Sequence, residues 1–347
     1  MATARAPALA ARAPSEREHR TLLEGCGLLD RSERGKLALT GAGAVEFLNG
    51  QVTNELLTLA PGEGRYAAFL TPKGKMLGDL RVLALGAEGA APPGEAAPPG
   101  SGSEPAVREL LLDTERTALQ ALFDMIRRYK IGYEAQLHKR TLERGLLSLI
   151  GPQAASVAGA HTLADAEHAN AGVAIDGIAA LAVRTDIGID LICDAADTHA
   201  LGETLRARGA EAVSEVAAEC LRVERGRPRY GIDLDDTVIP QEAGLNERAV
   251  SFTKGCYVGQ ETVARLFYKG KPNRHLRGLR SGEPLATGQQ MLLGERAVGR
   301  VGSAAVSPTL GPIALALVRR EAEPGSVLAV QDSGASAEVL ELPFAAG

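Results

Sequence analysis

The chain has 347 residues, of which 45% are hydrophobic and 23% are charged, and its formal net charge is −5. That length suits roughly two to three globular domains with a core that needs neither disulfides nor structural metals. The acidic balance argues against a dedicated nucleic-acid-binding protein, whose affinity depends on a strongly basic surface, and leaves room for a local basic patch.

The N-terminal part of the chain is rich in alanine, proline and arginine, and residues 1–14 contain no acid. Such low-complexity sequence indicates a flexible tail, which we expect over residues 1–33. No apolar run approaches the roughly 18 residues of a membrane-spanning helix. The four cysteines are widely spaced without a CxxC pair, which argues against disulfides and zinc and favours the cytoplasm. The arginines of the tail keep the mitochondrial matrix as an alternative location.

Two strand-like runs, RYAAFLT and MLGDLRVLAL, are separated by a turn at residues 72–75 and predict a hairpin. Before them, Val45, Leu48, Val52 and Leu56 have helical spacing and predict one helix. In the second strand, alternation places Asp79 on the same face as Arg81. An acid is unfavourable in mid-strand, so the residues alone predict a solvated face or an Asp79–Arg81 pair there.

The rest of the chain alternates between helical and strand patterns. Residues 86–106 are rich in Pro, Gly and Ala and predict a flexible insertion. A helix is predicted over residues 114–130, with Thr114 as its cap, and another over 213–225. From about residue 276, short strands punctuated by Gly and Pro predict a small antiparallel barrel or sandwich. The fold class is therefore α+β.

The helix predicted over 213–225 ends with an acid on its apolar face. That face comprises Val213, Ala217, Cys220 and Leu221, and Glu224 continues it. Burying a carboxylate at the negative end of a helix costs several kcal/mol unless donors compensate. Two alternatives stay open: a buried Glu–Arg pair, or a ligand that presents two adjacent N–H donors, as a 2-amino-4-oxo pteridine does. Gly226 suits the C-cap.

A basic stretch lies downstream of this helix. It predicts either a solvated face or a site for a polyanion, such as the glutamate tail of a folate or RNA phosphate. The stretch comprises Arg265, Lys269, Lys271, Arg274, Arg277 and Arg280.

Cys256 lies between two glycines in the segment KGCYVGQE, residues 254–261. Lys254 and backbone N–H groups of a curled loop can lower the pKa of a thiol. No His lies near Cys256 in sequence, so the residues do not support a Cys–His nucleophile. A structural thiol, a reactive or transfer cysteine, and one ligand of a cluster shared with a partner remain open.

The octapeptide KGCYVGQE resembles the signature of the YgfZ folate-binding family. Other segments match in the order that this family shows: FLNGQVTNEL, FLTPKGKMLGDLRVL, RVERGRPRYGIDL, IPQEAGLNERAVSF and ELPF. These segments are similar to the wider superfamily of the glycine cleavage aminomethyltransferase (T-protein). The resemblance implies a three-domain, ring-like arrangement, with two interleaved α+β domains in a folate-binding body over residues 34–270 and a C-terminal β-barrel domain over 271–347.

The resemblance also implies tetrahydrofolate as cofactor, with Glu224 as the carboxylate that holds the pteridine. Asp79 falls where the aminomethyltransferases carry an acid implicated in catalysis, but those enzymes usually have Asp-Asp where this sequence has Gly78-Asp79. The candidate catalytic residues are Cys256 and Asp79, and no metal is expected. The candidate cofactor-binding residues are Glu224, Arg229, Tyr230, Glu242, Lys254, Gln260, Glu261 and Arg265.

The function that the resemblance implies is a tetrahydrofolate-dependent role in iron–sulfur cluster assembly or maintenance, including that of tRNA-modifying enzymes. The expected partners are folate, polyglutamylated or not, and iron–sulfur assembly proteins or client enzymes, with no membrane partner. The alternatives are a folate-dependent aminomethyltransferase or other one-carbon transferase, and a non-catalytic adaptor or RNA-associated protein. Aromatic residues make up only 3% of the chain, which disfavours direct tRNA binding through base stacking.

Overall fold

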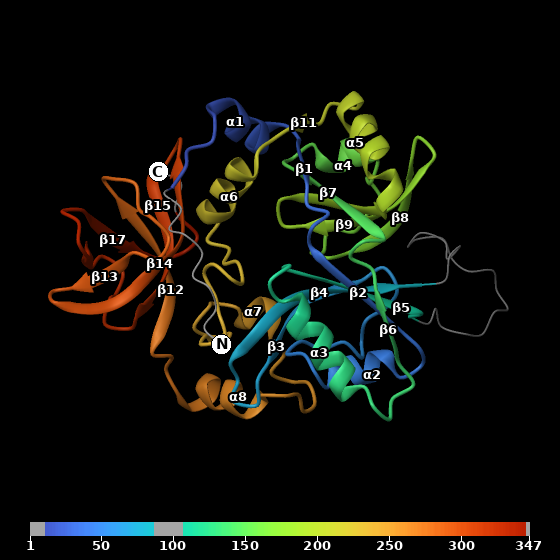
Figure 1. The fold of residues 1–347 in the computed structure, drawn as a ribbon, viewed down its shortest axis with the longest axis horizontal. Coiled ribbons are helices and arrows are strands. Elements are labelled where there is room, and N and C mark those ends of the chain that lie inside the picture. The colour runs from blue at the N-terminus through green and yellow to red at the C-terminus, as the bar shows by residue number, and fades with distance from the viewer. Residues whose placement is uncertain (1–10, 87–106, 345–347) are drawn as a thin grey trace. The chain divides into compact units, whose positions relative to one another are not determined.

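A computed structural model describes residues 11–86 and 107–344, and Figure 1 shows its elements. The predicted insertion over 86–106 therefore lies almost wholly outside the described residues. The chain divides into two compact units. The barrel unit comprises Met1–Arg20, Ser214–Gly244 and Arg265–Gly347, and the two-sheet unit comprises Thr21–Val213 and Leu245–Ala264.

The first sheet of the two-sheet unit has five strands in the order β3-β4-β5-β2-β6, all antiparallel. Its strands are β2 (Gly35–Thr40), β3 (Gly64–Leu70), β4 (Met76–Leu85), β5 (Glu109–Thr114) and β6 (Gln136–Lys139). Helix α3 (Leu119–Tyr129) packs on β4 and β2, and α2 (Ala44–Asn49) packs on β5. The predicted hairpin is confirmed, because β3 and β4 pair across the turn at residues 72–75.

The second sheet of this unit has six strands in the order β11-β1-β7-β10-β9-β8. Its strands are β1 (Gly27–Asp30), β7 (Arg144–Ile150), β8 (Asn170–Ile175), β9 (Ile178–Thr185), β10 (Gly188–Asp194) and β11 (Glu211–Ala212). Two helices, α4 (Ala154–Ala158) and α5 (Thr198–Ala207), cover the sheet at β7. A 3-10 turn, η1 (Ala195–Asp197), leads into α5, and the short α7 (Asn246–Ala249) packs on β3 of the first sheet.

The barrel unit contains a closed antiparallel barrel in the order β12-β15-β14-β13-β16-β17. Its strands are β12 (Arg274–Ser281), β13 (Gln290–Leu293), β14 (Arg296–Ser307), β15 (Gly311–Arg319), β16 (Val327–Val330) and β17 (Ser336–Leu340). Helix α6 (Glu215–Glu224) packs on β14 and β15. Small apolar side chains such as Ala314 and Ala316 fill the interior, as a narrow barrel requires. The predicted α+β class with a C-terminal β-barrel is confirmed.

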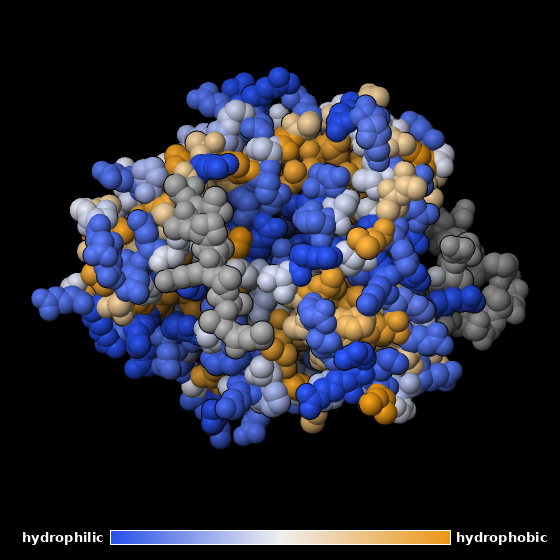
Figure 2. Space-filling model, in the orientation of Figure 1, coloured by the Kyte–Doolittle hydropathy of each residue, from blue (hydrophilic) through white to orange (hydrophobic). Residues whose placement is uncertain are grey.

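Two helices cross from one unit to the other along the chain, α1 (Glu16–Glu24) and α8 (Gln260–Lys269). In the described ranges, none of the helices has the length and apolarity needed to cross a membrane. Figure 2 shows polar and charged side chains spread over the visible face, with apolar side chains exposed between them. That mixture agrees with the ordinary share of charged residues in the sequence.

Three local predictions are corrected by the structure. Residues 16–30 form α1 and β1 and not a tail, because Ser15 and Glu18 form a capping box that starts α1. The helix predicted through residue 56 ends at Asn49, whose side chain accepts a hydrogen bond from Leu56 N–H in the following turn. Thr114 ends strand β5 and does not cap α3, since its hydroxyl donates to the carbonyl of Asp79 on the neighbouring strand.

Candidate functional site

Asp79 is buried in the middle of β4, with 7% of its surface exposed. The hydroxyl of Tyr66, on the paired strand β3, donates to Asp79 Oδ2 at 2.7 Å. Burial raises the pKa of Asp79 to about 6, although the Tyr66 hydrogen bond opposes that shift. The same burial keeps the pKa of Tyr66 well above its ordinary value, so its hydroxyl stays a donor. Asp79 can therefore exchange a proton near neutral pH.

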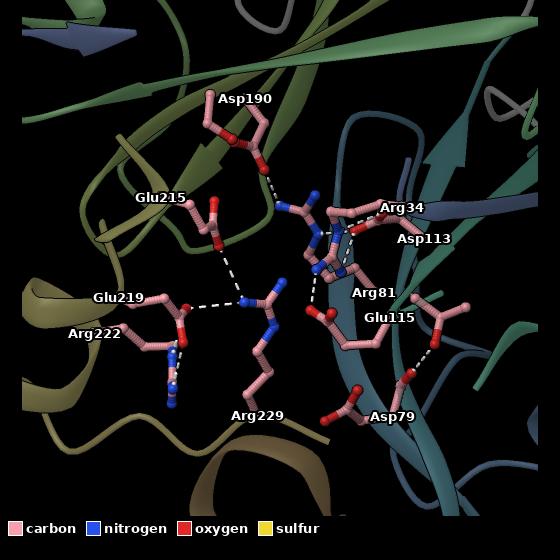
Figure 3. A network of polar contacts seen from close by, with 12 residues as sticks. Arg34, Asp79, Arg81, Asp113, Glu115, Asp190, Glu215, Glu219, Arg222 and Arg229 are labelled. Carbon is pink, nitrogen blue, oxygen red and sulfur yellow. Dashed lines mark hydrogen bonds and ion pairs between the residues drawn. The ribbon is translucent and has the colours of Figure 1, made fainter. Parts of the chain in front are cut away.

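Arg81 does not pair with Asp79. Its guanidinium donates to Asp113 at 2.7 Å and to Asp190 at 2.6 Å, as Figure 3 shows. Arg34 donates to the other oxygen of Asp113 at 2.9 Å and also pairs with Glu115. The predicted solvated face and the predicted Asp79–Arg81 pair are both wrong, because this network binds Arg81 while Asp79 is left with Tyr66.

A side chain has no space at position 78, where the resemblance led us to compare Gly78 with the first acid of an Asp-Asp pair. A Cβ atom at Gly78 would lie 2.6 Å from the Cβ of Ala118 and 2.6 Å from the ring of Phe69. Real Cβ atoms do not approach so closely, so a side chain at position 78 would have to displace Ala118, just before α3, and the ring of Phe69. The glycine at position 78 is therefore required by the close packing of its neighbours.

Two further side chains, those of Arg248 and His168, lie beside Tyr66, and no sequence pattern beyond their residue types points to them. The guanidinium of Arg248 lies 5.1 Å from the centroid of the Tyr66 ring and forms an ion pair with Glu167. The ring of His168 lies 6.3 Å from that of Tyr66, centroid to centroid. Burial lowers the pKa of His168 to about 3, so its imidazole is neutral beside Tyr66 at physiological pH.

Glu224 lies on the last turn of α6, as predicted, and only 11% of its side chain is exposed. Its partners are not arginines. His19 Nε2 lies 2.9 Å from Glu224 Oε1, and the thiol of Cys220 donates to the same oxygen at 3.5 Å. The buried Glu–Arg alternative is therefore wrong. The C-cap prediction is confirmed, because Gly226 has a left-handed φ of 66° and its N–H binds the carbonyl of Val223.

Two arginines near α6, Arg222 and Arg229, are bound to acids of the same unit. Arg222 pairs with Glu219 at 2.7 Å and with Asp233 at 3.0 Å. Arg229, a predicted cofactor-binding residue, pairs with Glu215 and Glu219, each at 3.0 Å (Figure 3). These pairs hold the segment after α6, including the half-buried Tyr230, along the helix.

Cys256 is exposed, whereas the other three cysteines are buried. The loop that carries it is anchored by Lys254, which is 8% exposed. Lys254 Nζ donates to three backbone carbonyls, those of Asn49 (2.7 Å), Val52 (2.9 Å) and Asn54 (2.6 Å). All three ammonium donors are used in these contacts, which give Lys254 a structural role, and its predicted cofactor contact stays a prediction.

The remaining predicted binding residues have three different environments. Gln260 begins α8 and contacts the carbonyl of Gly255 at 3.4 Å, while Glu261 and Arg265 on the same helix are exposed. Glu242 is 5% exposed and binds Arg274 through both oxygens, at 3.1 and 2.9 Å, and its predicted ligand contact stays a prediction. In the barrel unit, Lys271 and Arg277 of the basic stretch line a cavity of about 560 Å³.

Within the described residues, one group of side chains has donor atoms of the kind that transition metals bind. His19, Cys220 and Glu224 each offer one such atom, and the three atoms lie within 4.8 Å of one another. Hydrogen bonds already join Glu224 Oε1 to both His19 and Cys220, so the three side chains form one hydrogen-bonded cluster.

Comparisons with known proteins agree over nearly the whole chain. The GCVT N-terminal domain matches residues 7–89, and the glycine cleavage T-protein C-terminal barrel domain matches residues 274–345. Aminomethyltransferases of Streptomyces avermitilis and Streptomyces coelicolor are each 30% identical, over 95% of this chain and 89% of their own. The glycine cleavage system aminomethyltransferase T of Bartonella henselae superposes with a TM-score of 0.79, at 25% identity, over 95% of this chain and 89% of its own.

Proposed function

The protein belongs to the aminomethyltransferase family, and from that premise we propose that it binds tetrahydrofolate and transfers a one-carbon group at Asp79. The named relatives favour this alternative over the iron–sulfur role that the octapeptide implied. The observation that carries the proposal is the Asp79–Tyr66 pair, a buried carboxyl whose pKa of about 6 suits proton transfer at neutral pH.

In the proposed reaction, Asp79 takes or returns the proton of a nitrogen. The C–N bond between the methylene carbon and an amine breaks, a bond from that carbon to a folate nitrogen forms, and the proton of that folate nitrogen passes through Asp79 to the leaving amine. An ionised Asp79 accepts that proton, and its raised pKa lets the protonated carboxyl return it. Tyr66 holds Oδ2, so Oδ1 is the oxygen that faces the substrate in this proposal.

The pteridine is assigned to Glu224. A 2-amino-4-oxo pteridine presents N–H donors side by side, and a carboxylate is a strong acceptor for them. Among the described residues, Glu224 Oε1 has two partners and Oε2 has none. Oε2 is therefore the oxygen that we propose for the ligand, while Oε1 is bound by His19 and Cys220.

We expect the protein to bind tetrahydrofolate saturably in an anaerobic calorimetric titration, and a Glu224→Gln variant to bind at least about tenfold more weakly. The amide keeps the shape of the carboxylate but loses the charge, and charge-assisted hydrogen bonds contribute about 1.5–3 kcal/mol. A matched Glu341→Gln variant, with an exposed carboxylate in the same unit, should bind like the parent protein. No binding by the parent protein would refute the folate assignment.

A second function, iron–sulfur maintenance of the YgfZ type in the cytoplasm, is supported by Cys256 alone. Cys256 is the exposed cysteine, and Lys254 fixes the loop that presents it. This function predicts that an iron–sulfur enzyme recovers its activity after oxidative damage at least about tenfold more slowly with a Cys256→Ser variant than with the parent protein. The reason is that a hydroxyl cannot replace a thiolate. The variant's affinity for tetrahydrofolate should stay unchanged, and a Thr253→Ser variant should support full recovery. Full recovery with Cys256→Ser would exclude this function.

A further inference from the structure

The carboxylate of Glu224 is held by His19 from outside its own helix and by Cys220 from within it. His19 is 4% exposed and Cys220 is 0% exposed, and both reach Glu224 Oε1. An ionised carboxylate only accepts hydrogen bonds, so the proton of this contact lies on His19 Nε2. Burial and the Glu224 charge raise the pKa of Cys220, so its thiol also stays a donor.

The residue before His19 binds the opposite end of the same helix. Glu18 accepts a hydrogen bond at 2.7 Å from the N–H of Ser214, the N-cap of α6. Its other oxygen accepts from the hydroxyl of Ser15 at 2.8 Å, and hydrogen bonds from Ser214 and Ser15 lower the pKa of Glu18 to about 2. Glu18 and His19 thus fix α1 at both ends of α6, which leaves the His19 ring little freedom beside Glu224.

Glu224 needs such a partner for two reasons. The negative end of the α6 dipole disfavours a carboxylate at its last residue. A glutamate side chain also has three rotatable bonds, and freezing them for a ligand costs free energy. A fixed N–H donor at 2.9 Å offsets the charge and selects one rotamer before any ligand arrives.

We propose that His19 is a positioning residue for folate binding: it locks Glu224 in the rotamer that presents Oε2 to the N–H donors of the pteridine. Cys220 completes the hold on Oε1 from one turn earlier in α6. This inference rests on the proposed assignment of the pteridine to Glu224. It adds a determinant of affinity that does not touch the ligand and lies 205 residues from Glu224 in the chain.

The test is a double-mutant cycle on the full chain, with the Kd for tetrahydrofolate measured by anaerobic calorimetry and the Tm measured alongside. The variants are His19→Leu, His19→Gln, Glu224→Gln and the double variant His19→Leu/Glu224→Gln. We expect His19→Leu to weaken binding about tenfold in the parent background and less than about twofold in the Glu224→Gln background. His19→Gln retains an N–H near the Nε2 position and should recover most of the affinity.

Each alternative outcome has a distinct meaning. Equal weakening by His19→Leu in both backgrounds, or no rescue by His19→Gln, would overturn the inference and leave His19 as a packing residue. If Glu224→Gln binds too weakly to measure, the comparison of Leu with Gln at position 19 decides alone. A His199→Leu variant, on the exposed face of α5, should match the parent protein. Binding by the parent that Glu224→Gln does not weaken would refute the assignment of the pteridine to Glu224, and the inference with it, whereas no binding by the parent would refute the proposed function.

Discussion

An Asp79→Asn variant is expected to transfer the one-carbon group about 10²–10⁴ times more slowly than the parent protein. At pH 7.5 the same variant is expected to be more stable. The loss follows from removing the proposed base. The gain follows from burial, which raises the pKa of Asp79 from 3.8 to about 6. That pKa difference corresponds to a gain of roughly 3 kcal/mol in the free energy of unfolding when the carboxyl is removed. Burying the new amide N–H costs about 1 kcal/mol, so a net gain of about 2 kcal/mol remains.

The sign of the pH dependence separates this expectation from a general stabilisation. A carboxyl with a raised folded pKa costs stability once it must ionise, so the cost is absent below pH 3.8 and complete above about pH 6. The advantage of Asp79→Asn in urea unfolding should therefore vanish on acidification through that window. The transfer rate of the parent protein should rise through the same window.

Transfer is measured as exchange of a labelled methylene group between tetrahydrofolate and an amine. The matched control is Asp165→Asn, whose carboxylate is fully exposed, and it should change neither rate nor stability. An Asp79→Asn variant that keeps the rate within about threefold would refute the role of Asp79. Absence of transfer by the parent protein would refute the transferase proposal.

The sequence predicted those features that depend on residues close together in the chain. The inward direction of Glu224 followed from helical spacing to Cys220 and Leu221 within one helix. The hairpin around Asp79 followed from alternation and the turn at residues 72–75. In both cases the local pattern and the tertiary packing favour the same arrangement.

The partners of these residues could not be predicted, because they depend on long-range packing. His19 reaches Glu224 from 205 residues away, and Lys254 Nζ binds Asn49 O across the same separation. For Glu224 the sequence left an arginine partner and a pteridine ligand open, and for Lys254 it indicated a nearby thiol or a cofactor, so neither observed partner was among the predictions. The contact of Tyr66 with Asp79 could have been predicted. Tyr66 lies diagonally opposite Asp79 in the predicted hairpin, where an aromatic side chain can contact its neighbour.

Among the acids that bind Arg34 and Arg81, Asp113 should contribute most to the stability of the protein. It is 0% exposed, lies opposite Arg81 in the β4–β5 register, and binds both Arg34 and Arg81. Removing one partner of a buried ion pair leaves the other charge unpaired, at a cost of about 3–5 kcal/mol. We expect Asp113→Asn to lower the free energy of unfolding by that amount. The exposed pair of Arg144 and Asp194 provides the control, since Asp194→Asn should cost at most about 1 kcal/mol.

The pH dependence of Asp113 has the opposite origin to that of Asp79. Burial alone raises the pKa of Asp113, but Arg34 and Arg81 outweigh it and hold the pKa well below its ordinary value. Its stabilising contribution is therefore complete above pH 3.8 and is lost as the pH falls below that value. Between about pH 4 and pH 6, only the difference between the parent and Asp79→Asn should change, while the deficit of Asp113→Asn stays constant. A deficit for Asp113→Asn below about 1 kcal/mol at pH 7 would mean that the two arginines do not depend on it. The network would then not be what holds Arg81 away from Asp79 and leaves that carboxyl to Tyr66 and the substrate.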